Sequence, residues 1–525
     1  MKKIIILLVA VLLCCSAVFA GCTDKTGYSN NLTINASDAV SSNGGFAVVK
    51  GDYLYYINGV ETNTADNTYG DVVTGALVRT KIAELANPAE AKPEMVIPAL
   101  FVAGDMTSGF YMFGANVYYA SPSTTKNKEG IIENSKLDFV KTSLDGKTST
   151  TIKTVADKAT VYRFVEANGV VYLILKTVNE DSETVIQIIN ANDGKEVIAT
   201  EKIENVIFTD GGNGAEVYYT RIAHDDVLDQ DEAYNEIHRV TVEGKDEILL
   251  SGKGQYGNAE GDETGFGVSG AKFTLIKDTA DTLYFSAAYV DTSITSVTRY
   301  YAVKKADLAG PASEEEADVA SAIAANQAKI VLLNEGTASA STVFAANSYY
   351  KDVNTIVYLD ATHGIVKYDY ATTDASAVDG RIRLFYDKDL VAYTVKFWQD
   401  GYLYLADASN YYYRVNVDAL LDADTTNDNV SVEKINFLAN STSWYAPEVV
   451  GEYFISVYTA EPYNSLVYVS NITANSALTD EEIEAIQEST EEQVTANLAT
   501  SISIVSEAIQ EKIDTYMEDT FGEEE

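Results

Sequence analysis

Short segments in which apolar and polar residues alternate recur along most of this chain, and many of them centre on tyrosine. In residues 51–56, for example, a Gly-Asp turn leads directly into the run Tyr-Leu-Tyr-Tyr. Related phrases stand at residues 114–119, 168–173, 214–219, 279–285, 353–359, 400–405 and 450–455. Turn residues that accept positive φ, placed between alternating runs, are typical of β-hairpins. The pattern therefore predicts antiparallel β-structure from about Phe46 onward.

A second hairpin follows most of these phrases, as in residues 141–148 and 188–195. Two hairpins supply four strands, which is one propeller blade, and recurrence every ~40–70 residues is consistent with blades that carry variable loops. The candidate modules begin near Phe46, Gly109, Thr160, Asn205, Lys272, Asn347, Tyr393 and Ser443. We therefore predict an all-β fold, a β-propeller of seven or eight four-stranded blades over residues 46–475. The last module is one strand short, and we expect residues 31–34 to complete it.

Two segments have helical character instead. Residues 313–316 (Ser-Glu-Glu-Glu) have capping-box spacing before an Ala-rich stretch, which predicts a short surface helix over 317–329. Residues 476–525 predict a C-terminal α-helical tail, an amphipathic helix followed by acidic residues. Its apolar stripe consists of Ile483, Ile486, Val494, Leu498, Ile502, Val505, Ile509 and Ile513. The stripe is expected to pack on the propeller itself or on a partner, and both alternatives stay open.

The first residues have the layout of a secretory signal peptide. A Met-Lys-Lys start precedes an apolar run over 4–19 and the small pair Ala20-Gly21, directly before Cys22. The apolar run is shorter than the ~20 residues that span a bilayer. A cysteine at this position points to a bacterial lipoprotein whose thiol is acylated, which is sufficient for stable membrane attachment. We predict a signal peptide over 1–21, lipidation at Cys22 and a polar tether over 22–45; an ordinary signal peptide is the alternative.

Composition limits the possible partners. The 525 residues are too many for one ordinary compact core, but repeats escape that limit because each unit packs only on its neighbours. The formal net charge of −41 repels phosphate backbones, so no nucleic-acid partner is expected. Cys14 and Cys15 lie inside the signal segment, so the mature chain keeps one cysteine and forms no internal disulfide.

One loop resembles part of a calcium site. Oxygen-bearing side chains alternate over 422–428, and a glutamate stands twelfth from the first aspartate, as in an EF-hand loop. The candidate ligands are Asp422, Asp424, Thr426, Asp428 and Glu433. Asn427 replaces the glycine of that loop, so a polar inter-strand loop is the alternative, and no other cofactor is expected.

His224 and His238 flank an acidic segment, which indicates either a solvated loop or transition-metal capture.

The hairpin phrases over 51–56, with Asn58 after them, and over 142–147 resemble those of a group of bacterial lipoproteins. These carry a domain of unknown function related to the YWTD propellers of low-density-lipoprotein receptors. The resemblance covers about 46–473 and implies a propeller on an envelope lipoprotein, without catalytic residues. The intact Tyr-Trp-Thr-Asp tetrad is absent, so receptor-like ligand recognition is not implied.

From these patterns we predict a lipid-anchored, extracytoplasmic β-propeller of the bacterial envelope. It is expected to act as a binding or scaffold module for a protein or glycan partner, and not as an enzyme, with the membrane contacted through Cys22. The alternative is a polysaccharide-active propeller enzyme that uses paired carboxylates, because such pairs are not visible in a sequence. The sequence leaves open whether the cell envelope has one membrane or two.

Overall fold

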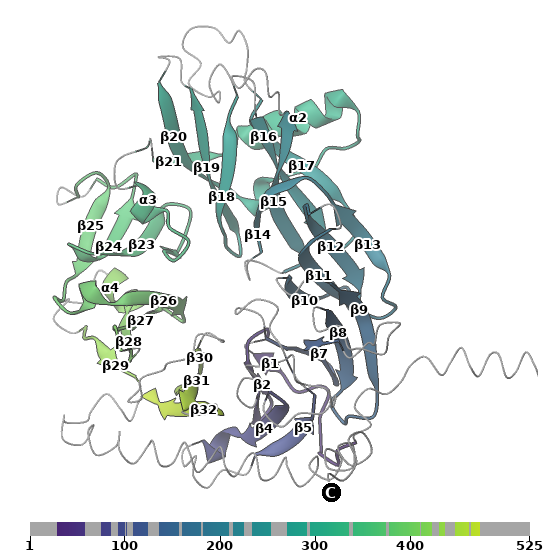
Figure 1. Cartoon of the computed structure of the whole chain (residues 1–525). Helices are drawn as coiled ribbons and strands as arrows, with labels where there is room; N and C mark the ends of the chain where they lie inside the picture. Colours follow the sequence, from purple (N-terminus) through teal and green to yellow (C-terminus); the bar gives the residue numbers. More distant parts are fainter. Residues whose placement is uncertain are drawn as a thin grey trace, which may run out of the picture. The chain divides into compact units, whose positions relative to one another are not determined.

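The computed structural model describes most of the chain between residues 29 and 472 (Figure 1). The described residues are 29–41, 43–57, 75–85, 93–99, 101, 109–123, 136–156, 160–179, 182–208, 214–224, 234–253, 270–290, 295–334, 336, 340–373, 377–409, 411–422, 430–435, 447–460 and 464–472. Over these residues, eight antiparallel sheets follow one another in chain order.

In each sheet, strands that neighbour in sequence are also neighbours in space. The first two sheets are β1(Val40–Ser41), β2(Ala47–Lys50), β3(Tyr53–Ile57), β4(Leu77–Lys81), β5(Glu94–Ile97), and β6(Tyr111–Phe113), β7(Asn116–Pro122), β8(Leu137–Ser143), β9(Ser149–Val155). The next three are β10(Val161–Ala167), β11(Val170–Val178), β12(Thr184–Asn190), β13(Glu196–Thr200); β14(Ile203–Ile207), β15(Glu216–His224), β16(Tyr234–Thr241), β17(Asp246–Ser251); and β18(Lys272–Asp278), β19(Thr282–Val290), β20(Ser296–Lys304), β21(Val331–Asn334). The last three are β22(Tyr349–Tyr350), β23(Thr355–Asp360), β24(Gly364–Asp369), β25(Arg381–Phe385); β26(Thr394–Gln399), β27(Tyr402–Ala406), β28(Tyr412–Asn416), β29(Glu433–Lys434); and β30(Glu448–Val450), β31(Tyr453–Ala460), β32(Asn464–Asn471).

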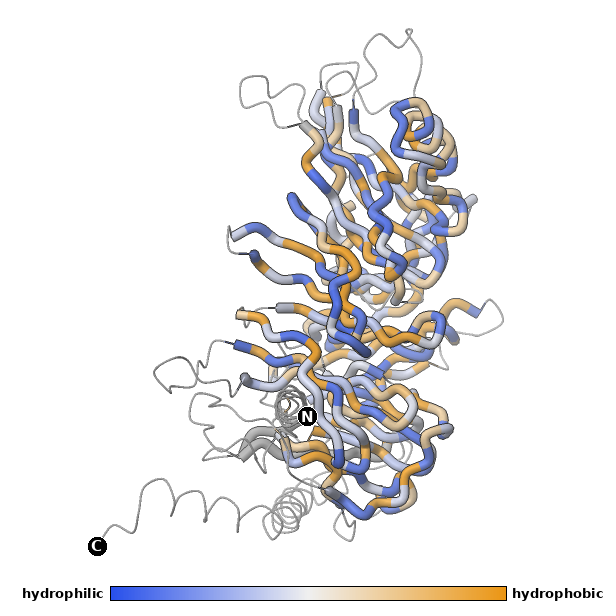
Figure 2. The backbone as a smooth tube through the Cα atoms, turned by 90° about the vertical axis from the view of Figure 1, so that its right-hand side faces the viewer, coloured by the Kyte–Doolittle hydropathy of each residue, from blue (hydrophilic) through white to orange (hydrophobic). Residues whose placement is uncertain are grey.

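The strands form where the alternation predicts them, because successive side chains point to opposite faces of a sheet. Hydrophobic and hydrophilic positions alternate along the backbone in Figure 2. Central strands bury large tyrosines, including Tyr118, Tyr219, Tyr284 and Tyr404, each at most 2% exposed. The all-β class and the propeller type of blade are thus confirmed. Seven sheets have four or five strands, and the eighth has three among the described residues.

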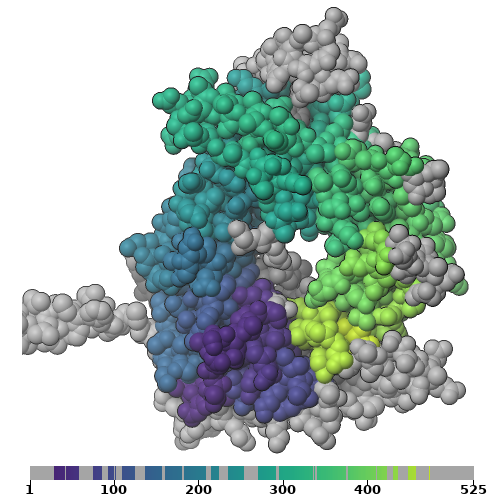
Figure 3. Space-filling model, turned by 180° about the vertical axis from the view of Figure 1, so that it is seen from behind, coloured from purple at the N-terminus to yellow at the C-terminus, as the bar shows by residue number. Residues whose placement is uncertain are grey.

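The chain divides into two compact units. The first comprises residues 1–160, 191–194 and 435–525, and contains the first, second and last sheets. One apolar cluster joins these three sheets, with Phe46 and Leu54 from the first, Tyr119 from the second and Ile455 from the last. Figure 3 shows the purple atoms of the first sheet beside the yellow atoms of the last.

The second unit comprises residues 161–190 and 195–434 and contains the other five sheets. Each sheet packs on the next through an apolar cluster of its own. Between the sheets β10–β13 and β14–β17, for example, Ile186 and Ile188 meet Tyr219 and Val240. The faces of neighbouring sheets are therefore the cores of this unit, as expected of a repeat architecture.

The short surface helix is confirmed as α2(Glu316–Gln327), which packs on β17. The buried Asn326 ties it down, since its Nδ2 donates to the carbonyls of Leu249 and Ala309 at 2.9 Å each. The capping box expected at residues 313–316 does not form. The N-cap is Glu315, and its side chain makes no capping hydrogen bond. The short helices α3(Ala340–Val343) and α4(Val417–Leu421) lie between strands.

Three predictions concern residues that the structure does not describe: the signal peptide over 1–21, the lipidation of Cys22 and the C-terminal tail over 476–525.

The expectation that residues 31–34 complete the last sheet is wrong. They form no strand, and Val40–Ser41 (β1) instead pairs with β2 in the first sheet. Asn30 explains the difference, because its Nδ2 donates to the carbonyls of Val96 and Leu144 at 2.8 Å each. Leu32 and Ile34 then pack on the apolar cluster of the first unit.

Candidate functional site

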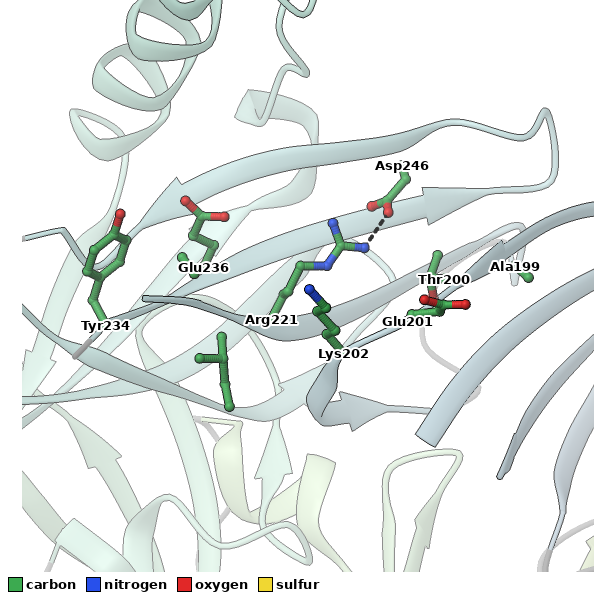
Figure 4. A pocket seen from close by; sticks show the side chains of 10 residues that line it. Ala199, Thr200, Glu201, Lys202, Arg221, Tyr234, Glu236 and Asp246 are labelled. Carbon is green, nitrogen blue, oxygen red and sulfur yellow. Dashed lines mark hydrogen bonds and ion pairs between the residues drawn. The ribbon is translucent and has the colours of Figure 1, made fainter. Parts of the chain in front are cut away.

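A charged cleft of about 570 Å³ lies in the second unit, between the sheets β10–β13 and β14–β17 (Figure 4). The last strand of one sheet and the turn after it supply one wall, and the strands β15, β16 and β17 supply the other. The lining residues are Ala199, Thr200, Glu201, Lys202, Arg221, Ile222, Ala223, Tyr234, Glu236 and Asp246. Six of these ten side chains carry a charge or a phenol, so the cleft is suited to a polar ligand.

Strand alternation brings its principal polar groups onto one face. Arg221 and Tyr219 are two residues apart on β15, and their cross-strand partners on β16 are Glu236 and His238. Residues at alternate positions, and their direct partners across an antiparallel pair, share a face of the sheet. Asp246 begins the neighbouring β17 and faces the same way.

These groups form one hydrogen-bonded network around Asp246. The hydroxyl of Tyr219 donates to Asp246 Oδ1 at 2.7 Å, and Arg221 Nη2 donates to Asp246 Oδ2 at 2.7 Å. The imidazole of His238 lies between two carboxylates, with Nδ1 3.3 Å from Asp246 Oδ1 and Nε2 3.2 Å from Glu236 Oε2. Its ring also stacks on Tyr219, with 5.2 Å between the centroids. Each polar group of the network thereby orients another.

The network shifts the protonation equilibria of its members. Burial alone would lower the pKa of His238, but its contacts with Asp246 and Glu236 outweigh burial and raise that pKa above its ordinary value. Burial opposes ionisation of Asp246 too, yet the contacts with His238, Tyr219 and Arg221 hold its pKa below the usual range. Asp246 is therefore an anion that orients a cation, Arg221, and an imidazole that readily binds a proton.

Lys202 enters the cleft from an unusual backbone conformation. It stands between β13 and β14 with φ of +59°, in the left-handed region that side chains other than Gly, Asn and Asp rarely adopt. Figure 4 shows its side chain directed toward Arg221. Such strain persists only where the surrounding structure imposes it, and it concentrates at functional sites.

The opposite face of the same sheet also carries charges, but these are paired with one another. Tyr218 donates to Glu216 Oε2 at 2.5 Å, and Arg239 Nη2 donates to Glu247 Oε2 at 2.6 Å. Nearby, Lys305 forms an ion pair with Asp278, whose pKa burial raises to about 6. This face packs on the next sheet, so its charges serve the fold and are not a second candidate site.

The candidates from the sequence fall elsewhere. Asp424, Thr426 and Asp428 lie outside the described residues, whereas Asp422 follows α4 and Glu433 lies on β29. The carboxylate of Glu433 accepts a hydrogen bond from Arg414 Nε at 2.6 Å, an interaction with which calcium would have to compete. Among the described residues, no group of three or more His, Cys, Asp or Glu is arranged to hold a metal ion. The calcium site stays a prediction.

The solvated loop expected around His238 is wrong for this residue, because His238 lies on β16 with 5% exposure. The residues Lys202, Arg221, Glu236 and Asp246 were missed altogether. The spacing of Tyr219 and Arg221, and of Glu236 and His238, does place each pair on one face of a strand. It does not reveal which neighbouring sheet that face meets.

Replacing Asp246 by Asn is expected to lower the pKa of His238, because burial remains while the neighbouring anion is lost. The chain has three histidines, so the imidazole signal is assignable by NMR titration. Glu247→Gln is the matched control, since Glu247 is adjacent in sequence but faces Arg239 on the other side. An unchanged pKa in the Asp246→Asn protein would show that Asp246 does not govern this imidazole.

Comparison with known proteins identifies similar folds and no family. No family model matches the chain, and no curated protein matches it. A structure of prolyl endopeptidases is similar with 12% identity and a TM-score of 0.36, over 75% of this chain and 50% of that one. The β-propeller domain of the Trilobed protease from Pyrococcus furiosus matches with 10% identity and a TM-score of 0.32, over 84% and 95%. An acylaminoacyl peptidase from Pyrococcus horikoshii matches with 10% identity and a TM-score of 0.31, over 84% and 52%.

The prediction that this protein is not an enzyme is corrected by these comparisons, because the matched structures include peptidases. The chain spans about half the length of the prolyl endopeptidases, and the identity is so low that only the fold is comparable. The comparison therefore attributes none of their activities to this chain.

In the part of the chain that the structure describes, no helix has the length and apolarity needed to span a membrane.

Proposed function

We propose that this protein is a lipid-anchored, extracytoplasmic β-propeller of the bacterial envelope that binds a glycan in the cleft between β13 and the sheet β14–β17. The observation that carries the proposal is the lining of the cleft. It combines Lys202, Arg221, Glu236 and the partly buried phenol of Tyr234 with little apolar surface. Protein partners are usually held by buried aromatic and aliphatic anchors, whereas a hydroxyl-rich ligand needs many convergent hydrogen-bonding groups.

The N-terminal sequence supports the location. Cys22 follows a signal-peptide pattern, and Asn30 is the first of the described residues held on the sheets by buried hydrogen bonds. Eight residues of chain reach at most about 28 Å in any conformation. An acyl group on Cys22 would therefore keep Asn30, and the part of the first two sheets that it contacts, within about 28 Å of the membrane surface.

Binding is tested with the mature chain on arrays of glycans and of peptides. We expect glycan binding that Glu236→Gln weakens at least tenfold, because Glu236 lines the cleft and a neutral amide accepts hydrogen bonds less strongly. Glu243→Gln is the matched control, because Glu243 is exposed in the turn between β16 and β17, outside the cleft. Glycan binding that is equally strong in the Glu236→Gln protein would refute the assignment of the cleft.

Anchoring is tested separately in cells. Labelled palmitate should enter the wild-type protein and should not enter a Cys22→Ser variant, and the variant should leave the membrane fraction. A wild-type protein that takes up no label would refute the lipid anchor without affecting the cleft.

A polysaccharide-active enzyme is the second candidate, and one observation favours it. The carboxylates of Glu201, Glu236 and Asp246 line the same cleft, and glycoside hydrolysis uses a pair of carboxylates. Asp246 is engaged by Arg221 and Tyr219, which leaves Glu201 and Glu236 as the candidate pair, with Glu236 Oε2 3.2 Å from His238 Nε2. Release of reducing sugar from an array hit, abolished by Glu236→Gln, would establish this activity.

A further inference from the structure

Two cations in the cleft keep donors that the described residues do not use. Arg221 donates through Nη2 to Tyr219 and Asp246, while its Nη1 has no bond to a described residue. Lys202 likewise forms no ion pair or hydrogen bond within the described ranges. Because both residues line one cleft, an acidic ligand group can accept hydrogen bonds from both cations there, although Asp246 already compensates part of the charge of Arg221.

The position of the guanidinium is fixed in advance. Asp246 and Tyr219 hold Arg221 Nη2 at 2.7 Å and 2.6 Å, and the guanidinium carbon lies 5.3 Å from the centre of the Tyr219 ring. Because Arg221 is already oriented, ligand binding need not restrict this long side chain further. The backbone of Lys202 is in the left-handed region at the turn between β13 and β14, and its side chain is directed into the cleft.

The surrounding charge makes this arrangement selective. The whole chain has a formal net charge of −41, so an anion is repelled from most of its surface and is attracted only where cations are positioned for it. Glu201 and Glu236 line the same cleft and repel a ligand that is anionic throughout. They accept hydrogen bonds well from hydroxyl groups. The complementary ligand therefore combines one acidic group with several hydroxyls.

We infer that Arg221 and Lys202 form an acid-group subsite, and that the glycan bound in the cleft contains an acidic sugar whose carboxylate lies between them. This inference rests on the proposed function and specifies its ligand class. The carboxylate accepts hydrogen bonds from Arg221 Nη1 and Lys202 Nζ, while the sugar hydroxyls donate to Glu236 and Glu201.

The test compares uronate-containing oligosaccharides with the same oligosaccharides after methyl esterification, by calorimetry on the full mature chain. Esterification removes the charge and keeps the hydroxyls, so we expect affinity to fall at least tenfold. Lys202→Asn should cause a similar loss for the acid form and little change for the ester. Asn accepts the left-handed backbone, so this variant should fold normally, which its melting curve checks. Lys253→Asn removes an equal charge outside the cleft and should bind as the wild type does.

The outcomes separate this inference from the proposed function. If Lys202→Asn and esterification change nothing while Glu236→Gln abolishes binding, the cleft binds glycans but the acid-group subsite is refuted. If no glycan binds and Glu236→Gln has no effect, the proposed function fails. Inorganic phosphate serves as a competitor: displacement of a uronate oligosaccharide supports the subsite, whereas phosphate binding without any uronate binding would refute the carboxylate assignment.

Discussion

Replacing Gly109 by Ala is expected to destabilise the first unit by about 3 kcal/mol or more, since the new methyl group cannot be accommodated. A Cβ built on Gly109 would lie 1.8 Å from the carbonyl oxygen of Gly45 and 2.0 Å from its carbon. Both atoms belong to the backbone, so the clash cannot be relieved by rotation of a side chain. The contact is close because the two segments are hydrogen-bonded. Gly109 N donates to Gly44 O at 2.8 Å and Phe110 N to Gly45 O at 3.0 Å.

Hydrogen exchange measures this effect locally. In the Gly109→Ala protein, the amides of Gly44 and Phe110, which are hydrogen-bonded across the two segments, should exchange much faster, because the segments before β2 and β6 must separate to admit the methyl group. Gly114→Ala is the control. Gly114 has φ of +58° but open space around its Cβ position, so the cost is that of the backbone alone, about 1 kcal/mol. If these amides are equally protected from exchange in the Gly109→Ala and Gly114→Ala proteins, the two segments can separate without cost.

The sheets were predictable because their signals are local. Turn residues and alternating strands stand together in sequence, and the modules expected near Thr160, Lys272 and Tyr393 begin at Val161, Lys272 and Thr394. The segment after Asn30 was not predictable in the same way. Its course depends on hydrogen bonds to carbonyls 66 and 114 residues away, which no local pattern encodes.

The cleft was hidden for a related reason. Asp246 follows the turn at Gly244 and resembles an ordinary solvated hairpin residue in the sequence. Its importance comes from Tyr219 and Arg221, which lie on a strand two places across the sheet. Lys202 joins them only because the sheet β10–β13 packs on that face. Sequence patterns predict which residues share a strand face, whereas the packing of sheets decides which faces enclose a site.

The second prediction of large effect concerns Glu448 on β30, which links the last sheet to the first within the first unit. Its Oε1 accepts hydrogen bonds from the backbone of Phe46 at 2.7 Å and of Ala47 at 3.4 Å. Its Oε2 is shielded from solvent and has no hydrogen-bond partner. Gly45 leaves room for this carboxylate, because a Cβ there would lie 1.7 Å from Oε1. Burial outweighs the two backbone bonds and raises the pKa of Glu448 to about 8.

We expect the first unit to lose stability as the pH rises from about 5 to 8, and Glu448→Gln to remove that loss. Between the ordinary pKa of 4.5 and the folded value of about 8, the folded protein holds a proton that the unfolded chain has released. Raising the pH therefore favours unfolding, by up to about 1.4 kcal/mol per pH unit. Below this window both states are protonated, and above it both are ionised, so the contribution of Glu448 is then constant.

Urea unfolding of the wild type and the variant at several pH values measures this difference, and subtracting the two curves cancels every other titrating group, provided that Glu448 acts independently. Glutamine has no titrating proton in this range, so its enclosed amide imposes a cost that does not vary with pH. Glu452→Gln is the matched control, because Glu452 is exposed on the turn between β30 and β31 and should leave the wild-type slope unchanged. If the free energy of unfolding of the Glu448→Gln protein keeps the full wild-type dependence on pH, the carboxylate of Glu448 is already ionised in the folded protein. The contact between the first and last sheets must then contain a buried negative charge.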